Sequence, residues 1–195
     1  MPMCRLPATV IDLEAKQRFK TVIQLSDEIK SLADWCQLGF VAPDAKVMMD
    51  RLLAIGFGPF KIYKVESRNW EGVNYRGAAA EDYALEVCMA DLGAWDVEII
   101  VPLPGSGKTI YSEYLDKQPA GGLHHLGTYL PPGEYDACYK YLEGLGYAQI
   151  QGGPIQGNDR NGRFDYFESD HEYGILLELL DMPEVYGTPD FEYPE

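Results

Sequence analysis

Apolar and polar positions follow a pattern that occurs twice along the chain. Residues 35–41 are mostly apolar and predict a strand that stops at Pro43-Asp44. Asp44 is suited to cap the start of a helix, because apolar residues recur at helical spacing after it, at Val47, Met48, Leu52 and Ile55. Gly56 and Gly58 then end this helix. The first unit therefore begins with a strand and an amphipathic helix.

Three more strands complete this unit, and the pattern then begins again. Strands are predicted at 60–65, 83–89 and 95–101, and residues 109–117 are expected to form a short connecting helix. The second copy is predicted to have a strand at 124–130, a helix at 135–145 and strands at 147–151, 163–168 and 174–180. Its helix carries one apolar stripe, formed by Tyr135, Cys138, Tyr139 and Leu142.

The repeated order of elements predicts an α+β fold made of two βαβββ modules. We expect an N-terminal arm over residues 1–30, a first module over 31–108, a second module over 109–183 and an acidic tail over 184–195. The arm is compatible with a short helix, whereas the Pro-rich tail predicts little regular structure. Internal repeats of this kind usually pair about a pseudo-twofold axis, so any site is expected where the modules face each other.

Composition narrows the classes of partner. Acidic side chains number 31 against 16 basic ones, which gives a net charge of -15. Such a surface repels phosphate backbones and anionic lipid, so we expect neither nucleic acid nor a membrane as partner. The N-terminus lacks the pattern of a signal peptide, and the four cysteines are widely spaced, so the sequence favours a cytoplasmic protein with free thiols.

The segment Gly121-Gly122-Leu123-His124-His125-Leu126-Gly127 concentrates the candidate chemistry. It holds two of the three histidines, and Gln37-Leu38-Gly39 occupies the same place in the first copy as His125-Leu126-Gly127 in the second. Successive strand residues point to opposite faces, so only one of the two histidines is expected to face a shared cavity. The repeat register selects His125, and His124 is interpreted either as a packing residue or as a residue that supports the metal ligand without contacting the metal. The third histidine, His171, lies in a polar turn and is expected at the surface.

The last strand of each copy carries one acidic residue inside an apolar run. These residues are Glu98 and Glu178. A carboxylate flanked by aliphatic residues can face solvent, or it can be buried against a compensating cation. Each copy then offers one ligand from its first strand and one from its last, which gives the metal site Gln37, Glu98, His125 and Glu178. An amide oxygen, two carboxylates and an imidazole suit Mn²⁺, Co²⁺, Ni²⁺, Fe²⁺ or Zn²⁺.

Other motifs give weaker evidence of function. Residues 105–109 resemble the end of a phosphate-binding loop, but Pro102 stands where that motif needs glycine. The Gly-rich residues 152–157 are interpreted as a mobile loop near the site. Five tyrosines are candidates to line a pocket, although packing in the core or at an interface is the more common role: Tyr63, Tyr75, Tyr83, Tyr129 and Tyr166.

At these positions the sequence resembles the vicinal oxygen chelate superfamily, and within it the methylmalonyl-CoA epimerase and glyoxalase-like branch. The resemblance covers about residues 35–183 and rests mainly on the Gly-Leu-His-His-Leu segment and the strand around Glu178. It implies paired modules that form a curved, partly closed mixed sheet around a divalent metal ion. Gln37 is a departure, because relatives commonly have histidine there. That departure leaves metal binding possible and weakens a reading as an iron dioxygenase, which needs two histidines and one carboxylate.

The leading hypothesis for function is a metal-dependent isomerase or epimerase, or a lyase. The metal would chelate a substrate carbonyl, and Glu98 or Glu178 would remove the adjacent α-proton to form an enolate. The expected partner is a small oxo or acyl compound, with acyl-CoA as one class, and we expect a homodimer. The phosphates of CoA would need cations, and the candidates are Lys61, Lys64, Arg68, Arg76, Arg160 and Arg163. The alternatives are a non-heme iron dioxygenase and a metal-free ligand-binding protein of the resistance type.

Overall fold

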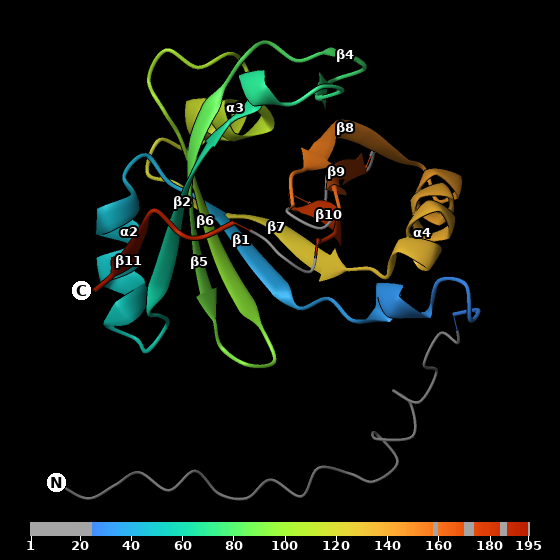
Figure 1. Cartoon of the computed structure of the whole chain (residues 1–195), viewed down its shortest axis with the longest axis horizontal. Helices are drawn as coiled ribbons and strands as arrows, with labels where there is room; N and C mark the ends of the chain where they lie inside the picture. The colour runs from blue at the N-terminus through green and yellow to red at the C-terminus, as the bar shows by residue number, and fades with distance from the viewer. Residues whose placement is uncertain (1–24, 158–159, 170–173, 184–186, 195) are drawn as a thin grey trace, which may run out of the picture.

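The computed structural model describes residues 25–157, 160–169, 174–183 and 187–194. Most of the predicted N-terminal arm and His171 lie outside these residues. Figure 1 shows two halves, each with a helix against part of a curved sheet. In the part of the chain that the structure describes, no helix is both long enough and apolar enough to cross a membrane.

The elements repeat in the predicted order. The first copy contains β1 (Gln37–Val41), α2 (Ala45–Leu53), β2 (Phe60–Glu66), β5 (Ala84–Asp91) and β6 (Asp96–Pro102). The second contains β7 (Gly122–Tyr129), α4 (Pro132–Gly144), β8 (Tyr147–Ile155), β9 (Gly162–Ser169) and β10 (Leu176–Asp181). The remaining elements are η1 (Lys30–Ala33), η2 (Ser67–Asn69), β3 (Asn74–Tyr75), β4 (Ala78–Ala79), α3 (Ile110–Lys117) and β11 (Phe191–Tyr193).

All strands belong to one mixed sheet in the order β11-β2-β5-β6-β1-β7-β10-β9-β8-β3-β4. The two copies meet at the antiparallel pair β1 and β7, and each of these strands runs parallel to the last strand of its own copy. The first and last strands of this order do not pair, so the sheet is curved without closing into a barrel. The predicted α+β class is confirmed.

The helices cover the outer side of each half. Asp44 caps α2 by accepting a hydrogen bond from the Val47 amide at 2.9 Å. The buried face of α2 consists of Ala45, Met49 and Leu52. The predicted stripe is therefore wrong at two positions: Val47 is 46% exposed, and Ile55 lies beyond the helix end and is 69% exposed. In α4 the predicted stripe is correct, because Tyr135, Cys138 and Leu142 are buried against the sheet in one cluster.

Three features differ from the sequence prediction. Residues 152–155 are part of β8 and not a loop, because they pair with residues 162–165 of β9. Glycine suits position 152, since a side chain there would collide with the Asp165 carboxylate. The predicted unstructured tail contains β11, which pairs with β2. The link between β2 and β5 contains the β3–β4 hairpin, which joins the sheet next to β8 in the other half. Strands β11 and β3 thus form through pairing with strands that are distant in the sequence.

Candidate metal centre

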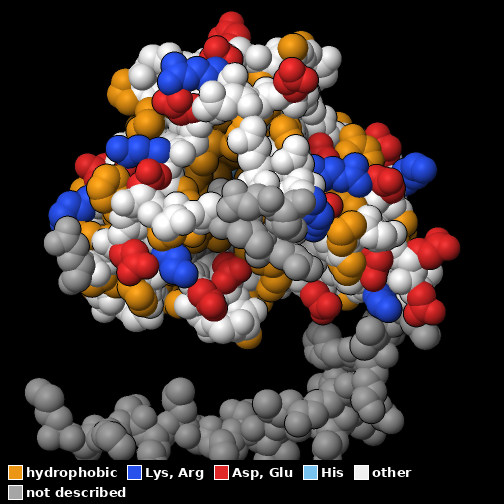
Figure 2. Space-filling view, in the orientation of Figure 1, with side chains coloured by type: hydrophobic (Ala, Val, Ile, Leu, Met, Phe, Trp, Pro, Cys, Tyr) orange, Lys and Arg blue, Asp and Glu red, His pale blue; other side chains and the backbone are white. Residues whose placement is uncertain are grey.

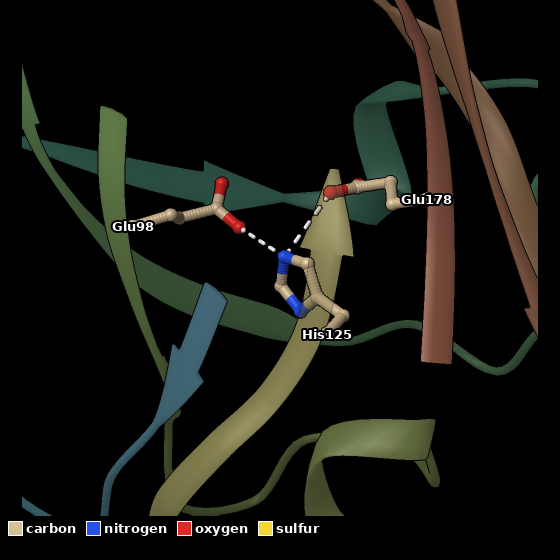
Figure 3. A group of neighbouring side chains, drawn as sticks. All are labelled: Glu98, His125 and Glu178. Atoms are coloured by element: carbon tan, nitrogen blue, oxygen red, sulfur yellow. Dashed lines mark ion pairs between the residues drawn. The ribbon is translucent and has the colours of Figure 1, made fainter. Parts of the chain in front are cut away.

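Three predicted ligands converge on one point. Glu98 on β6, His125 on β7 and Glu178 on β10 each present a ligand atom, and these atoms lie within 4.8 Å of one another. Nε2 of His125 lies 3.2 Å from Oε2 of Glu98 and 3.1 Å from Oε2 of Glu178. Figure 3 shows the two carboxylates reaching the imidazole from opposite sides. The group could hold a metal ion, since it combines one nitrogen and two oxygen donors.

Gln37, the fourth predicted ligand, lies on β1 next to this group. Its side chain is 1% exposed, and its Nε2 donates a hydrogen bond to the hydroxyl of Tyr129 at 3.2 Å. The hydroxyl of Tyr129 in turn interacts with the carboxylate of Asp96. Because Nε2 is engaged in this way, Oε1 is the atom of the amide that remains available to a cation.

Two glycines make room for the first-strand side chains. In the β1–β7 pair, Gly39 faces His125 and Gly127 faces Gln37. A Cβ atom at Gly39 would lie 1.9 Å from Nε2 of His125, and one at Gly127 would lie 2.3 Å from Oε1 of Gln37. Each copy therefore supplies a side chain to the site and a glycine against which the side chain of the other copy lies.

Unpartnered polar atoms test whether these residues fit a metal ion. Among the described side chains, five buried nitrogen or oxygen atoms have no hydrogen-bond partner. Four of them are Gln37 Oε1, Glu98 Oε2, His125 Nε2 and Glu178 Oε2. A buried polar atom without a partner costs roughly 1–3 kcal/mol, so it is rarely left without a compensating group. Ion pairs between His125 and the two carboxylates compensate three of these atoms when the imidazole is protonated, whereas Gln37 Oε1 has no hydrogen-bond partner. A bound cation would satisfy all four atoms at once.

The ionisable groups of the site influence one another strongly. Burial opposes the charged form of His125, but the two adjacent carboxylates outweigh it and raise the pKa of His125 to about 9. Burial raises the pKa of Glu178, although His125 counteracts it. Without a metal ion, the imidazole therefore carries a proton at neutral pH and neutralises part of the carboxylate charge.

His124 lies outside the group of candidate ligands, although the strand does not alternate regularly at this point. The β1–β7 register shifts at Gly39/Phe40, where Phe40 pairs with Leu123, so His124 is an extra residue in a bulge. Both imidazoles are consequently buried on adjacent positions, and their Nδ1 atoms lie 3.0 Å apart. Burial lowers the pKa of His124 well below its usual value, so this imidazole is neutral. With Nε2 of His125 directed at the metal centre, Nδ1 of His125 would donate its proton to Nδ1 of His124.

The centre lies on the wall of a cavity of about 440 Å³, a size typical of small-molecule sites. Gln37, Glu98 and Glu178 all line it. Aliphatic and aromatic side chains form most of the remaining wall, including Trp70, Tyr83, Leu85, Val87, Ile100, Tyr111, Phe164 and Tyr166. Figure 2 shows hydrophobic side chains inside a hollow near the middle of the face that is in view. The arrangement can hold a largely apolar molecule with one polar end at the metal centre.

Four of the five candidate pocket tyrosines line the cavity, and one does not. Tyr63, Tyr83, Tyr129 and Tyr166 line it, whereas Tyr75 does not and instead donates a hydrogen bond to Glu113. Trp70 and Tyr111 also line it and were not predicted as pocket residues. Tyr111 lies on the buried face of α3, whereas nothing in the local sequence pattern distinguishes Trp70.

Of the six candidate cations for CoA phosphates, only Lys61 lines the cavity. Four arginines form ion pairs with carboxylates: Arg68 with Glu66, Arg76 with Glu113 and Glu168, Arg160 with Asp181, and Arg163 with Asp136. Lys64 lies over the ring of Phe191, with its Nζ 5.2 Å from the centroid.

Comparison with solved structures identifies the fold. Methylmalonyl-CoA epimerase from Mycobacterium tuberculosis is similar at a TM-score of 0.54 and 16% identity, over 83% of this chain and 95% of that one. A hypothetical protein from Bacillus halodurans matches at 0.53 and 13% identity, over 79% of this chain and 97% of that one. A variant of Streptomyces coelicolor methylmalonyl-CoA epimerase in complex with 2-nitronate-propionyl-CoA matches at 0.50 and 15% identity, over 79% and 97%.

No family model matches the sequence, and no curated protein matches it significantly. The structural likeness shows that the chain shares the fold of these proteins, as the sequence predicted. At such low identity a shared fold leaves the reaction to be argued from the site itself.

Proposed function

We propose that this protein is a metal-dependent enzyme that removes a proton from the carbon next to a substrate carbonyl. The outcome would be epimerisation or isomerisation, or a lyase reaction if a leaving group follows. The observation that carries this proposal is the convergence of ligand atoms from Glu98, His125 and Glu178 within 4.8 Å of one another, beside a largely apolar cavity. The epimerase fold of the structural neighbours supports the same class of reaction.

Gln37, Glu98, His125 and Glu178 would hold the ion, which we propose to be Mn²⁺, Co²⁺, Ni²⁺, Fe²⁺ or Zn²⁺. When bound, a divalent ion there would supply Lewis acidity that lowers the pKa of the substrate carbon next to the carbonyl. The apolar wall favours this chemistry, because it excludes water from the site at which charge develops.

The protein's own contribution is a carboxylate base. Glu98 and Glu178 both line the cavity, and their side chains are 13% and 3% exposed. Burial raises the pKa of Glu178, which makes its ionised form a stronger base than a carboxylate in water. We therefore propose Glu178 as the main base and Glu98 as the second carboxylate, able to return the proton from the opposite side.

The substrate is proposed to be a small oxo or acyl compound. An acyl-CoA is one candidate, because a structural neighbour is described in complex with a propionyl-CoA analogue. Lys61 is the cation on the cavity wall that could meet one of its phosphates. A homodimer and a cytoplasmic location stay predictions.

The test combines metal analysis with isotope exchange. Purified protein loaded with Mn²⁺ should bind about one equivalent. In deuterated water it should catalyse exchange at the α-carbon of a member of a panel of acyl thioesters, 2-oxo acids and hydroxy acids. Glu178→Gln should abolish exchange while the fold is retained, and Glu143→Gln, an exposed carboxylate on α4, should leave exchange unchanged.

Two results would count against the proposal. Absence of exchange across the whole panel with stoichiometric metal would remove the proton-transfer step. Ligand binding without metal, unaffected by His125→Ala, would favour the metal-free binding protein instead.

A further inference from the structure

We infer that the substrate carries a bulky apolar group, of the size of an aromatic ring, which lies between the metal centre and residues 67–83. This inference rests on the proposed function and names the class of substrate. Residues 67–83, here called the crossover segment, connect β2 to β5. The segment contributes Trp70 and Tyr83 to the cavity wall.

The crossover segment joins the two halves of the molecule. It leaves the first copy at the end of β2, and its β3–β4 hairpin then pairs with β8, the outermost strand of the second copy. In Figure 1 the hairpin lies at the top of the molecule, while the β5–β6 turn lies at the opposite end of the first half. The segment thus spans the cavity at one end of strands β2 and β5.

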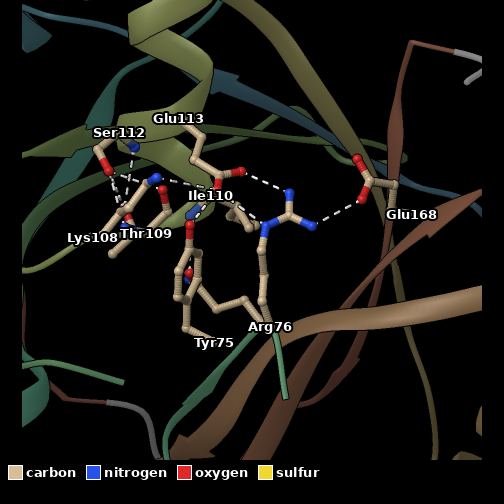
Figure 4. A network of polar contacts seen from close by, with 9 residues as sticks. Tyr75, Arg76, Lys108, Thr109, Ile110, Ser112, Glu113 and Glu168 are labelled. Carbon is tan, nitrogen blue, oxygen red and sulfur yellow. Dashed lines mark hydrogen bonds and ion pairs between the residues drawn. The ribbon is translucent and has the colours of Figure 1, made fainter. Parts of the chain in front are cut away.

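Several polar contacts hold the crossover segment in place. Arg76 makes hydrogen bonds of 2.7 and 3.0 Å with the Glu113 carboxylate on α3, and one of 3.1 Å with Glu168 on β9. Figure 4 shows this arginine between the two carboxylates, with Tyr75 on the same Glu113. On β8, the Gln149 amide donates to Asn74 at 2.8 Å. These contacts come from three different elements. The aromatic end of the cavity, lined by Trp70 and Tyr83, is therefore formed before a ligand arrives.

The character of the wall changes along the strands of the first half. Near the β5–β6 turn it is charged and open, with Lys61 and Asp91 exposed and Asp96 half-buried. Glu98 and Lys61 both pair with Met89, two ladder positions in from the Asp91–Asp96 pair next to that turn. Beyond Glu98 the lining residues of β2, β5 and β6 are uncharged, and they are Tyr63, Val65, Leu85, Val87 and Ile100.

The apolar part of the cavity is long enough to hold an aromatic ring. From the level of Glu98, strand β6 continues to Pro102, which pairs with Leu85 beside the crossover segment. Four residues of strand cover about 13 Å, which exceeds the length of a phenyl group. Tyr83, at 3% exposed, and Leu85, at 4%, line the far end. An acetyl-sized substrate would leave this apolar space to water, whereas a ring would fill it.

Two hydroxamates provide matched probes for binding. Acetohydroxamate and phenylacetohydroxamate present the same pair of oxygens to a metal ion and differ in the ring. Calorimetry on the Mn²⁺-loaded protein should show phenylacetohydroxamate binding tighter by a factor on the order of 10 to 100, because burial of a ring contributes that much. Equal affinity for the two probes would overturn the inference.

Substitutions in the cavity wall test where the ring of phenylacetohydroxamate binds. Trp70→Ala should reduce the preference for phenylacetohydroxamate about fivefold or more and leave acetohydroxamate binding unchanged. Trp95→Ala is the matched control, since Trp95 is 43% exposed in the β5–β6 turn and does not line the cavity. If Trp70→Ala does not fold, Val87→Phe fills the apolar part and should exclude only the larger probe. Equal weakening of both probes by Val87→Phe would also overturn the inference.

Failure of the inference and failure of the proposed function give different results. If both hydroxamates bind equally well and α-proton exchange occurs, the function stands and the apolar substrate group is wrong. If the ring-bearing probe is preferred with or without Mn²⁺ and no exchange occurs, the aromatic end stands and the proposed function fails.

Discussion

Gly39 on β1 lies directly against the imidazole of His125 on β7. A Cβ atom at this glycine would lie 1.9 Å from both Cε1 and Nε2 of the ring, well inside contact distance. The position of the imidazole therefore depends on the absence of a side chain on the neighbouring strand. Repeat symmetry extends this relationship to Gly127 and Gln37.

Gly39→Ala should displace the imidazole and weaken Mn²⁺ binding on the order of 100-fold, as the loss of a group that orients a metal ligand can do. Metal titration followed by calorimetry measures the effect. Gly133→Ala is the control, because nothing lies within 4 Å of a Cβ atom at this helical position. Unchanged affinity in Gly39→Ala would show that the ring does not bind the metal from this position.

Alanine substitution of the two histidines should separate their roles. His125→Ala removes a ligand and should abolish stoichiometric metal binding. His124→Ala removes the acceptor that lies 3.0 Å from Nδ1 of His125, so it should weaken binding by roughly 10- to 100-fold and leave it measurable. Complete metal loss in both variants would mean that both imidazoles are ligands.

Metal binding should depend on pH, because the two carboxylates raise the pKa of His125 to about 9 despite its burial. Below that pH the imidazole must lose a proton when a metal ion binds, so affinity should rise about tenfold per pH unit from 7 towards 9. Calorimetry in buffers of different ionisation enthalpy should detect one proton released at pH 7. Affinity independent of pH over this range would contradict the arrangement.

The same shift affects the metal-free protein in the opposite direction. Since the pKa in the folded state lies above the usual 6.5, the charged His125 stabilises the fold below pH 6.5, and this contribution is lost as the pH rises through 9. Denaturation of the metal-free protein at several pH values should show this loss, and His125→Ala should remove the dependence.

Anchoring of the crossover segment should weaken in acid. Hydrogen bonds from Arg76 lower the pKa of Glu113 to about 2 in the folded state, against a usual 4.5. The stabilisation is therefore present above pH 4.5 and is lost as the pH falls towards 2. Glu113→Gln should lower the free energy of unfolding at pH 7 on the order of 1 kcal/mol, because the ion pair is partly exposed, and should have little effect near pH 2. Asp116→Asn on the same helix is the control, and a loss of similar size there would contradict the assignment.

The repeat, its strands and the candidate site residues could be predicted from the sequence, because they follow from the order of apolar, polar and charged residues along the chain. Gln37 and His125 follow from register between the copies, and Glu98 and Glu178 stand out as charges within apolar runs. All four have a buried atom without a hydrogen-bond partner. Their role as metal ligands stays a proposal.

The remaining features depend on contacts between distant residues. The bulge at His124 arises from the pairing of Phe40 with Leu123, and alternation within β7 alone does not reveal it. The two-residue strands β3 and β4 are too short to produce a period of two. Trp70 reaches the cavity only because the crossover segment is held on the second half of the sheet.

The short strand β11 affects how this protein meets other polypeptides. It occupies the outer side of β2, where its Tyr193 hydroxyl lies 2.5 Å from Asp50 on α2, and the β3–β4 hairpin occupies the outer side of β8. An uncovered strand edge presents unpaired N–H and C=O groups and is a common starting point for strand exchange and aggregation. Strands of two or three residues give an incoming chain little to extend. The acidic, Pro-rich tail, which the sequence predicts to have little regular structure, thus protects the edge of the sheet from pairing with strands of other chains.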